Sequence, residues 1–155
     1  MAEAYDLIII GGGPTGLAAG LYGTRGRLKT LMIERGTIGG QLFVTEGVEN
    51  YPGIEFMLGP DMGKAMHKHA EKFGLITRYG EVEHIELDGF PLKHVKLTDG
   101  TEFTGKAVVI ATGSTYNKLE VPGEDEFAGK GVSYCAVCDG AFFQDMPLIV
   151  VGGGD

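Results

Sequence analysis

The chain has 155 residues, 43% of them hydrophobic and 22% charged, which is the balance of a soluble globular protein large enough to bury a core. Its 13 basic and 21 acidic residues give a formal net charge of −8 at pH 7, so a nucleic-acid partner with its anionic backbone is not expected. Residues 1–6 lack the basic region of a secretory signal, and no apolar run approaches the roughly 20 residues that cross a bilayer, so we expect a cytoplasmic protein without a membrane partner.

The first part of the chain predicts a βαβ unit built around a glycine turn. Tyr5–Ile10 is an apolar run typical of a buried parallel strand, and it ends at three consecutive glycines. Small and apolar residues over Thr15–Arg25 predict a helix packed on the sheet, and Thr30–Ile33 predicts a second buried strand. Strand, glycine turn, helix and strand together indicate an α/β fold.

The middle of the chain predicts a long loop, a helix and an antiparallel insertion. The loop runs from Gly36 to Pro60, and a loop of this length inside a compact domain is usually functional or disordered. The helix is expected at Asp61–Phe73. The strands of the insertion are expected at Leu75–Tyr79, Val82–Leu87, His94–Leu97 and Glu102–Thr104. Asp99-Gly100 supplies the hairpin signal between the last two strands.

The last third of the chain predicts a return to the parallel sheet and the start of a different unit. Lys106–Ile110 is a further buried strand, and Ser114–Gly123 contains the breakers of a linker. Val132–Tyr134 and Leu148–Val151 then begin the next unit. Its final segment, residues 149–154, resembles residues 8–13 in pattern.

The glycine turn has the context of a dinucleotide-binding motif, because Gly11-x-Gly13-x-x-Gly16 follows a strand and opens a helix. Gly11 permits the tight turn, Gly13 lets the backbone approach a pyrophosphate, and Gly16 allows the helix to pack closely on the strand. Free N–H groups of the first helical turn then point at the phosphates. Glu34 ends the second strand, where a carboxylate can bind ribose hydroxyls. The motif alone does not separate FAD from NAD, but residues 111–113 (Ala-Thr-Gly) after another buried strand favour FAD.

The two cysteines of the chain, Cys135 and Cys138, form one Cys-x-x-Cys pair. Structural zinc usually needs four ligands, so we expect no metal. Redox chemistry is favoured: one thiolate attacks a partner disulfide, and the other resolves the mixed disulfide. A helix that begins at the pair would favour the thiolate. Asp139 is a candidate proton donor and acceptor for the leaving thiolate.

Several segments resemble the low-molecular-weight thioredoxin reductases in order and spacing, and these belong to the FAD/NAD(P)-linked disulfide reductases. The segments are residues 11–16, 39–42, 49–53, 111–113, 121–124 and 131–140. The sequence Cys-Ala-Val-Cys-Asp-Gly is the most specific, because other disulfide-reductase flavoproteins place their cysteine pair elsewhere; Ala-Thr is the commoner middle. The resemblance implies an α/β flavoprotein with two dinucleotide-binding domains. An FAD-binding domain would occupy residues 1–115, and an NAD(P)H-binding domain would start at 116–155.

The resemblance also implies roles for individual residues. Cys138 would be the sulfur nearest the flavin, Cys135 would attack the partner, and Asp139 would act as acid and base. Residues 39–42 and Asn50 would approach the flavin, while Val82 would meet the adenine through its backbone. The implied cofactor-binding residues are Gly11, Gly13, Pro14, Thr15, Gly16, Glu34, Arg35, Gly39, Gly40, Gln41, Leu42, Asn50, Val82, Ala111, Thr112, Gly113, Gly152 and Gly154.

The activity implied by the resemblance moves electrons from NADPH to FAD, then to the Cys135–Cys138 disulfide, and then to thioredoxin or a thioredoxin-like protein. The complete protein would be a homodimer in which the nucleotide domain rotates between two states. Because the family is about twice as long as this chain, the resemblance implies an N-terminal half that is inactive on its own and binds FAD weakly or not at all. Two alternatives stay open. One is a relative that is driven by ferredoxin or runs as a dithiol oxidase, and the other is a non-catalytic module that binds FAD or a partner protein.

Overall fold

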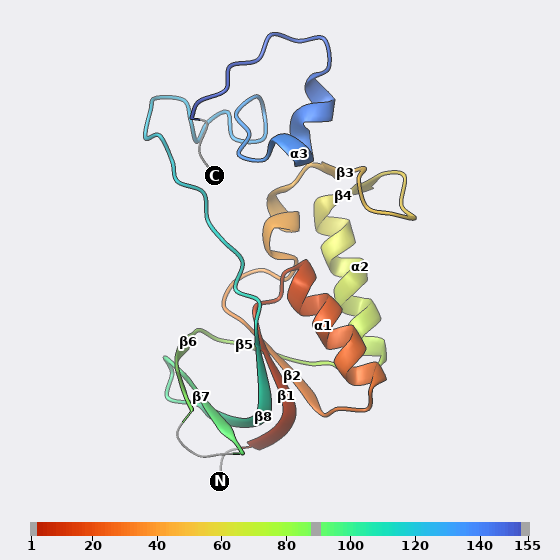
Figure 1. The fold of residues 1–155 in the computed structure, drawn as a ribbon, viewed down its shortest axis with the longest axis vertical. Helices are drawn as coiled ribbons and strands as arrows, with labels where there is room; N and C mark the ends of the chain where they lie inside the picture. The colour runs from red at the N-terminus through yellow and green to blue at the C-terminus, as the bar shows by residue number, and fades with distance from the viewer. Residues whose placement is uncertain (1–2, 88–90, 153–155) are drawn as a thin grey trace.

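The computed structural model describes residues 3–87 and 91–152 of the chain. The strands are β1 (Glu3–Ile10), β2 (Thr30–Glu34), β3 (Gly47–Val48), β4 (Met57–Leu58), β5 (Ile76–Tyr79), β6 (Val82–Glu86), β7 (Lys93–Leu97) and β8 (Glu102–Ile110). The helices are α1 (Pro14–Arg25), α2 (Gly59–Lys72) and the single turn α3 (Ala136–Asp139), with 3-10 turns η1 (Gly40–Val44) and η2 (Gly140–Phe143). Figure 1 shows α1 and α2 beside the sheet, and α3 in a separate region that an extended segment reaches.

The predicted βαβ unit is present at the centre of the sheet. β1 pairs in parallel with β2 on one side and with β8 on the other, and β2 pairs in parallel with β5. The side chains of Ile8 and Ile9 are fully buried, as expected for a parallel strand that is covered on both faces. The carboxyl ends of these parallel strands therefore lie at one edge of the sheet.

The expected antiparallel insertion forms, but its last strand is not separate from the parallel sheet. We predicted two strands, Glu102–Thr104 and Lys106–Ile110, and this was wrong because β8 runs without a break through Gly105. Its first half pairs with β7 in antiparallel orientation, and it also pairs in parallel with β1. A Cβ at Gly105 would lie 2.9 Å from the side chain of Ile8, so glycine here serves close packing and does not end the strand.

Two hydrophobic clusters cover opposite faces of the parallel strands, because side chains alternate along a strand. The strand order is β5-β2-β1-β8-β7-β6, although β5 and β6 are neighbours in the chain, so the antiparallel strands fold back over one face. The cluster on that face contains Tyr5, Ile8, Ile10, Leu31, Ile33, Val95, Leu97 and Phe103. The cluster under α1 and α2 contains Leu7, Ile9, Leu17, Met32, Ala70 and Leu75. Helices, parallel strands and antiparallel strands thus form three layers (Figure 1).

The segment predicted as one long loop, Gly36–Pro60, contains short regular elements. η1 lies within it, and β3 and β4 form a two-stranded antiparallel ladder. The predicted helix Asp61–Phe73 is α2, which begins at Gly59 with Pro60 in its first turn. Proline is suited to that place, because the first helical N–H groups have no partner within the helix.

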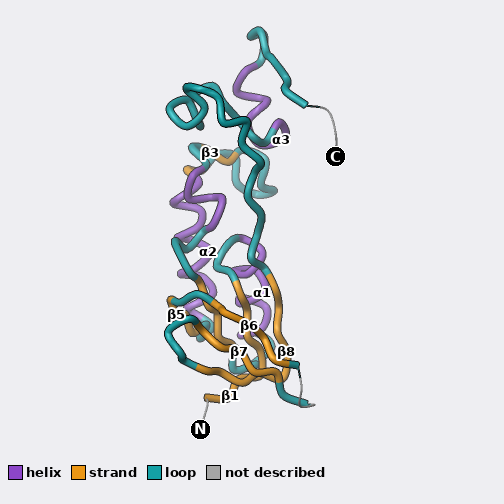
Figure 2. The backbone as a smooth tube through the Cα atoms, turned by 90° about the vertical axis from the view of Figure 1, so that its left-hand side faces the viewer, coloured by secondary structure: helices purple, strands orange, loops and turns teal. Residues whose placement is uncertain are grey.

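The region after β8 has little regular structure. The predicted linker Ser114–Gly123 runs as an extended segment towards α3 (Figure 2). Val132 makes one isolated bridge with Ala128, so 132–134 is not a strand, and residues 148–151 are exposed and outside any described ladder. Among the described residues, the buried apolar side chains lie between Tyr5 and Phe103. The predicted domain division after residue 115 stays a prediction.

None of the helices in the described residues has both the length and the apolar composition that crossing a bilayer requires.

Candidate functional site

A cleft of about 1070 Å³ opens at the carboxyl ends of the parallel strands. Ile10, Ile33 and Ile110, at or next to the ends of β1, β2 and β8, lie at its base, and η1 and the start of β6 add further walls. In open α/β sheets this edge is where ligands bind. The volume lies at the upper end of the range of about 300–1,000 Å³ for small-molecule sites, so the cleft has room for a ligand as large as a dinucleotide.

The glycine turn after β1 forms one wall of the cleft, and its three motif glycines serve different purposes. Gly11 has φ +108°, and a Cβ there would overlap the carbonyl oxygen of Ala111. A Cβ on Gly16 would overlap the carbonyl oxygen of Gly11. Gly13 differs, because within 4 Å a Cβ on it would meet only the Cα of Gly40, at 4.0 Å, among the described residues. Gly11 and Gly16 are therefore needed to build the turn, whereas Gly13 leaves open space beside the backbone.

The first turn of α1 is suited to an anion at this wall. α1 is 12 residues long and begins at Pro14, and its N-cap Gly13 has no side-chain hydrogen bond to cap it. The N–H groups of the first helical turn have no partner within a helix. Pro14 and Thr15 both line the cleft. The free N–H groups and the positive end of the helix dipole together fit a phosphate group.

Glu34 connects the glycine turn to the segment after β2. The backbone N–H of Gly12 donates to its Oε2 at 2.5 Å, and the N–H of Gly36 donates to its Oε1 at 2.6 Å. Each carboxylate oxygen can accept a further hydrogen bond. Glu34 also lines the cleft. Its carboxylate is thus fixed in orientation and can still bind hydroxyl groups such as those of a ribose.

The cysteine pair lies in the other region of the chain, where Cys135 and Cys138 form a disulfide. A helical turn, α3, begins at the pair, with Cys135 at its N-cap position. The backbone N–H of Cys138 donates to Cys135 Sγ at 3.2 Å, and that of Asp139 donates to the carbonyl of Cys135 at 3.0 Å. The turn therefore directs one backbone donor, the N–H of Cys138, at the first sulfur, which favours its thiolate form once the disulfide is reduced.

Ser133, which precedes the cysteine pair in the chain, holds Asp139, which follows it. The Ser133 hydroxyl donates to Asp139 Oδ2 at 2.5 Å and accepts the N–H of Cys135 at 3.1 Å. None of Cys135, Cys138 and Asp139 is among the residues that line the cleft. Asn50 connects the two regions, because its Nδ2 donates to the carbonyl of Val137 at 3.5 Å.

Comparison with known proteins identifies the family that combines such a cleft with a Cys-x-x-Cys disulfide. The model for pyridine nucleotide-disulphide oxidoreductases matches residues 5–155. The chain belongs to this family.

Among curated members, thioredoxin reductases from Bacillus subtilis and Listeria monocytogenes are 54% and 52% identical to this chain over 153 residues. The alignments cover 99% of this chain but 48% and 47% of those proteins. The chain thus spans about half the length of the curated relatives it matches.

Solved structures of the family confirm the predicted α/β fold class. A thioredoxin reductase from Streptococcus pyogenes aligns with a TM-score of 0.88 at 46% identity, over 94% of this chain and 47% of that one. The Lactococcus lactis enzyme in its FR conformation aligns with a TM-score of 0.71 at 48% identity, over 90% of this chain and 45% of that one.

Most of the family-type cofactor residues that we predicted lie at the cleft. Those that line it are Gly11, Gly13, Pro14, Thr15, Glu34, Arg35, Gly40, Gln41, Val82, Ala111, Thr112 and Gly113. Gly16 lies behind the turn, and Gly39 supports it by donating its N–H to the carbonyl of Gly12 at 2.8 Å. Their contribution to the cleft is therefore indirect.

Three further predicted residues that the structure describes do not line the cleft. Leu42 is in η1 and Asn50 contacts the dithiol segment, and neither lines the cleft. Gly152 is exposed in the C-terminal segment and does not line the cleft. Gly154 lies outside the described residues. A role for these glycines in binding a second nucleotide stays a prediction.

Sequence reasoning missed most of one wall, residues 80–85, of which it named Val82 alone. The segment reaches the cleft because β5 pairs in parallel with β2, and the N–H of Gly80 donates to the carbonyl of Glu34 at 3.0 Å. We had expected β5 to belong to the antiparallel insertion, which would have directed this segment elsewhere.

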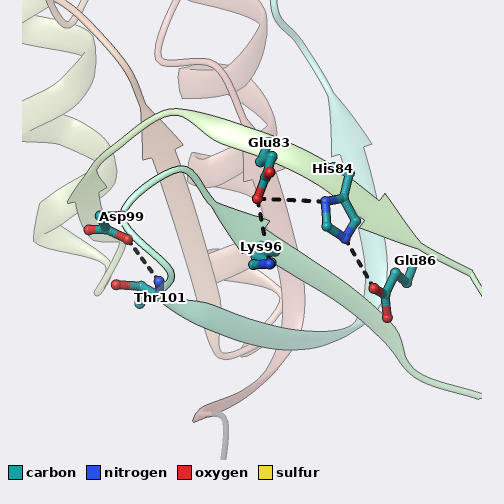
Figure 3. Close-up of polar contacts among 6 residues, drawn as sticks. All are labelled: Glu83, His84, Glu86, Lys96, Asp99 and Thr101. Atoms are coloured by element: carbon teal, nitrogen blue, oxygen red, sulfur yellow. Dashed lines mark hydrogen bonds and ion pairs between the residues drawn. The ribbon is translucent and has the colours of Figure 1, made fainter.

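His84 on this wall lies between two carboxylates (Figure 3). Its Nε2 is 3.0 Å from Glu86 Oε1, and its Nδ1 is 3.8 Å from Glu83 Oε2. Lys96 of β7 also approaches Glu83, at 3.7 Å. The hydrogen bond with His84 holds the pKa of Glu86 below its ordinary value. The described residues contain no cluster of three His, Cys, Asp or Glu side chains that could hold a metal ion.

Proposed function

We propose that this chain carries the FAD site and the redox dithiol of a thioredoxin-disulfide reductase that uses NADPH. The observation that carries the proposal is one polypeptide with both a dinucleotide-sized cleft at a glycine turn and a Cys-x-x-Cys disulfide beside an aspartate. Relatives named thioredoxin reductases align over 99% of the chain, dithiol included. These relatives support thioredoxin as the partner.

The cleft residues suit FAD in a specific way. The open backbone at Gly13 and the first turn of α1 would bind the pyrophosphate, and Glu34 would bind the adenosine ribose. Gly40 and Gln41 of η1 would lie on the flavin side. Bound FAD would supply the two-electron chemistry that joins a nicotinamide donor to a disulfide.

The dithiol would pass electrons on by thiol–disulfide exchange. The Cys135 thiolate attacks one sulfur of the partner disulfide, and the other partner sulfur leaves as a thiolate. The Cys138 thiolate then attacks Cys135 Sγ, which re-forms the Cys135–Cys138 disulfide and releases the second partner thiolate. Two electrons reach the partner in this way. Asp139 would remove the proton from the Cys138 thiol and return protons to leaving thiolates, in an orientation that Ser133 fixes.

The test uses the complete polypeptide that contains this chain. We expect it to bind FAD, to oxidise NADPH in the presence of thioredoxin, and to lose this activity when Cys138→Ser removes the resolving thiol. Reduction of the flavin by ferredoxin but not by NADPH would favour the ferredoxin-driven alternative. Oxygen consumption with small dithiols would favour the dithiol oxidase. Tight FAD binding without turnover in any of these assays would favour the non-catalytic module. A protein that stays colourless when FAD is added would contradict the proposal.

A further inference from the structure

Tyr116 contacts both the cleft region and the dithiol region. Its ring stacks on that of Tyr134, with centroids 4.9 Å apart and planes 8° from parallel. Its hydroxyl donates to Gln41 Oε1 at 3.4 Å. Tyr134 directly precedes Cys135, and Gln41 lines the cleft. One side chain therefore connects the backbone beside the disulfide with the η1 wall of the cofactor cleft.

The Tyr134 end of this connection is rigid. The Tyr134 hydroxyl donates to Glu124 Oε1 at 2.7 Å, and Glu124 is only 5% exposed. The same carboxylate accepts the N–H groups of Leu119 at 3.0 Å and Glu120 at 2.7 Å. A shielded carboxylate with these donors is costly to disrupt, because its loss leaves several groups unpaired. Residues 119–134, together with the Cys135–Asp139 turn that Ser133 holds, therefore behave as one unit, which we call the dithiol body.

The Gln41 end is ordered but releasable. Gln41 Nε2 donates to the carbonyl of Ser114 at 3.1 Å, which turns Oε1 towards the Tyr116 hydroxyl. The bond from Tyr116 is longer than an ordinary O–H···O bond, and both residues are exposed, so water can replace it once the two regions separate. If the dithiol body moves away from the cleft, this contact can break while the Tyr116–Tyr134 stack persists.

We propose that Tyr116 is a positioning residue that holds the dithiol body against the η1 wall of the cofactor cleft and releases it when the body moves. The proposal rests on the proposed function, because a held position matters only if the disulfide must exchange electrons with a group in the cleft. A hydrogen bond of this kind shifts the equilibrium between the held and the released position of the dithiol body by roughly two- to tenfold. The contact is therefore strong enough to bias the position of the dithiol body without locking it.

The first experiment does not depend on flavin. Hydrogen–deuterium exchange is measured on the oxidised complete polypeptide without FAD, in peptides that cover residues 39–45 and 132–139. Tyr116→Phe removes the hydroxyl and keeps the stack, and we expect exchange in both segments to rise by roughly two- to tenfold. Tyr116→Leu removes both contacts and should have a larger effect. The control is Tyr22→Phe, whose ring on α1 is 74% exposed.

The second experiment measures the rate at which the disulfide takes electrons from reduced flavin in the FAD-loaded protein. Tyr116→Phe should lower this rate by roughly two- to tenfold and leave the dissociation constant for FAD unchanged. Wild-type exchange in residues 39–45 for both Tyr116 variants, or an unchanged electron-transfer rate in Tyr116→Phe, would overturn the positioning role. A wild-type protein that binds no FAD would instead contradict the proposed function, and the exchange data would still decide whether Tyr116 makes the contact.

Discussion

The hydroxyl oxygen of Ser133 lies 2.5 Å from Oδ2 of Asp139, across the single helical turn that separates the two cysteines. The same hydroxyl accepts the N–H of Cys135. Ser133 thus connects the first cysteine to the carboxylate that follows the second. A carboxylate that transfers a proton within this turn must keep a fixed orientation. In the proposed acid–base role of Asp139, the hydroxyl of Ser133 would provide this orientation.

Ser133→Ala removes the hydrogen bonds to Asp139 and from the N–H of Cys135. It should therefore slow dithiol–disulfide exchange with thioredoxin by at least roughly two- to tenfold, the effect of losing one such bond. Stopped-flow measurement of the exchange step in the complete polypeptide checks this. Ser133→Thr keeps the hydroxyl and should restore most of the rate. Equal rates for wild type and Ser133→Ala over the whole pH range would show that Asp139 needs no support from Ser133.

The Glu124–Tyr134 pair predicts an unusual tyrosine titration. The hydrogen bond to Glu124 raises the pKa of Tyr134 to about 12, and burial adds to the effect. In an absorbance titration at 295 nm, we therefore expect a tyrosine component from Tyr134 at this high pH. Tyr134→Phe should remove that component, and Glu124→Gln should move it towards the ordinary range. A wild-type curve in which all tyrosines ionise together near pH 10 would contradict the pair.

The same pair sets a pH window for the stability of the dithiol body. The Tyr134 hydroxyl and the N–H of Leu119 hold the pKa of Glu124 below its ordinary value. The stabilisation that Glu124 gives to the folded state is therefore present above the pKa that Glu124 has in the unfolded chain, and it is lost as pH falls through its pKa in the folded protein. Tyr134 has a raised pKa, so the stabilisation that its hydroxyl gives to the folded state is complete below the pKa of Tyr134 in the unfolded chain. This stabilisation is lost as pH rises through about 12. The protection factors of the amides of residues 119–134, which correct the exchange rate for its intrinsic pH dependence, should therefore be largest between these limits and smaller on both sides.

The βαβ unit and the glycine turn could be predicted because both depend on local pattern. Apolar runs ending in glycine specify buried parallel strands, and Gly11, Gly13 and Gly16 specify the turn between strand and helix. The cysteine spacing likewise allows the helical turn that is present at α3. In each case the residues that determine the structure lie within a few positions of one another.

What the sequence did not predict depends on pairing between distant segments. The parallel pairing of β5 with β2, and the pairing of β8 with both β1 and β7, leave no local pattern. The wall at residues 80–85 was missed for this reason. The contacts of Tyr116, Glu124 and Tyr134 were missed because they arise only when the segment we interpreted as a linker folds onto the dithiol body.

Glu34 makes a prediction about the architecture of the cleft. Glu34→Gln replaces one carboxylate oxygen by an NH₂ group, which cannot accept the N–H of Gly12 or Gly36. Because a hydrogen bond to a charged group contributes about 1.5–3 kcal/mol and this site is partly exposed, we expect unfolding to become easier by about 1–2 kcal/mol. Denaturant titration of the complete polypeptide measures this. Arg35→Gln, the exposed neighbour that pairs at 3.6 Å with Glu81, is the control and should change stability by less than about 1 kcal/mol.

The different surroundings of Gly13 and Gly16 allow ligand binding to be separated from folding. Gly16→Ala should destabilise the protein by about 1–3 kcal/mol, because its methyl group overlaps the carbonyl of Gly11. Gly13→Ala has open space for its methyl group, so its cost is mainly that alanine is a poorer N-cap than glycine, and unfolding should become easier by about 1 kcal/mol or less. That methyl group would occupy the place that we propose for the pyrophosphate, so FAD binding should weaken by about ten- to hundredfold. Thermal unfolding without FAD and flavin fluorescence titration measure the two effects. Because Gly13 lines the cleft whereas Gly16 lies behind it, a Gly13→Ala protein that binds FAD as tightly as wild type would mean that the phosphates do not lie at this turn.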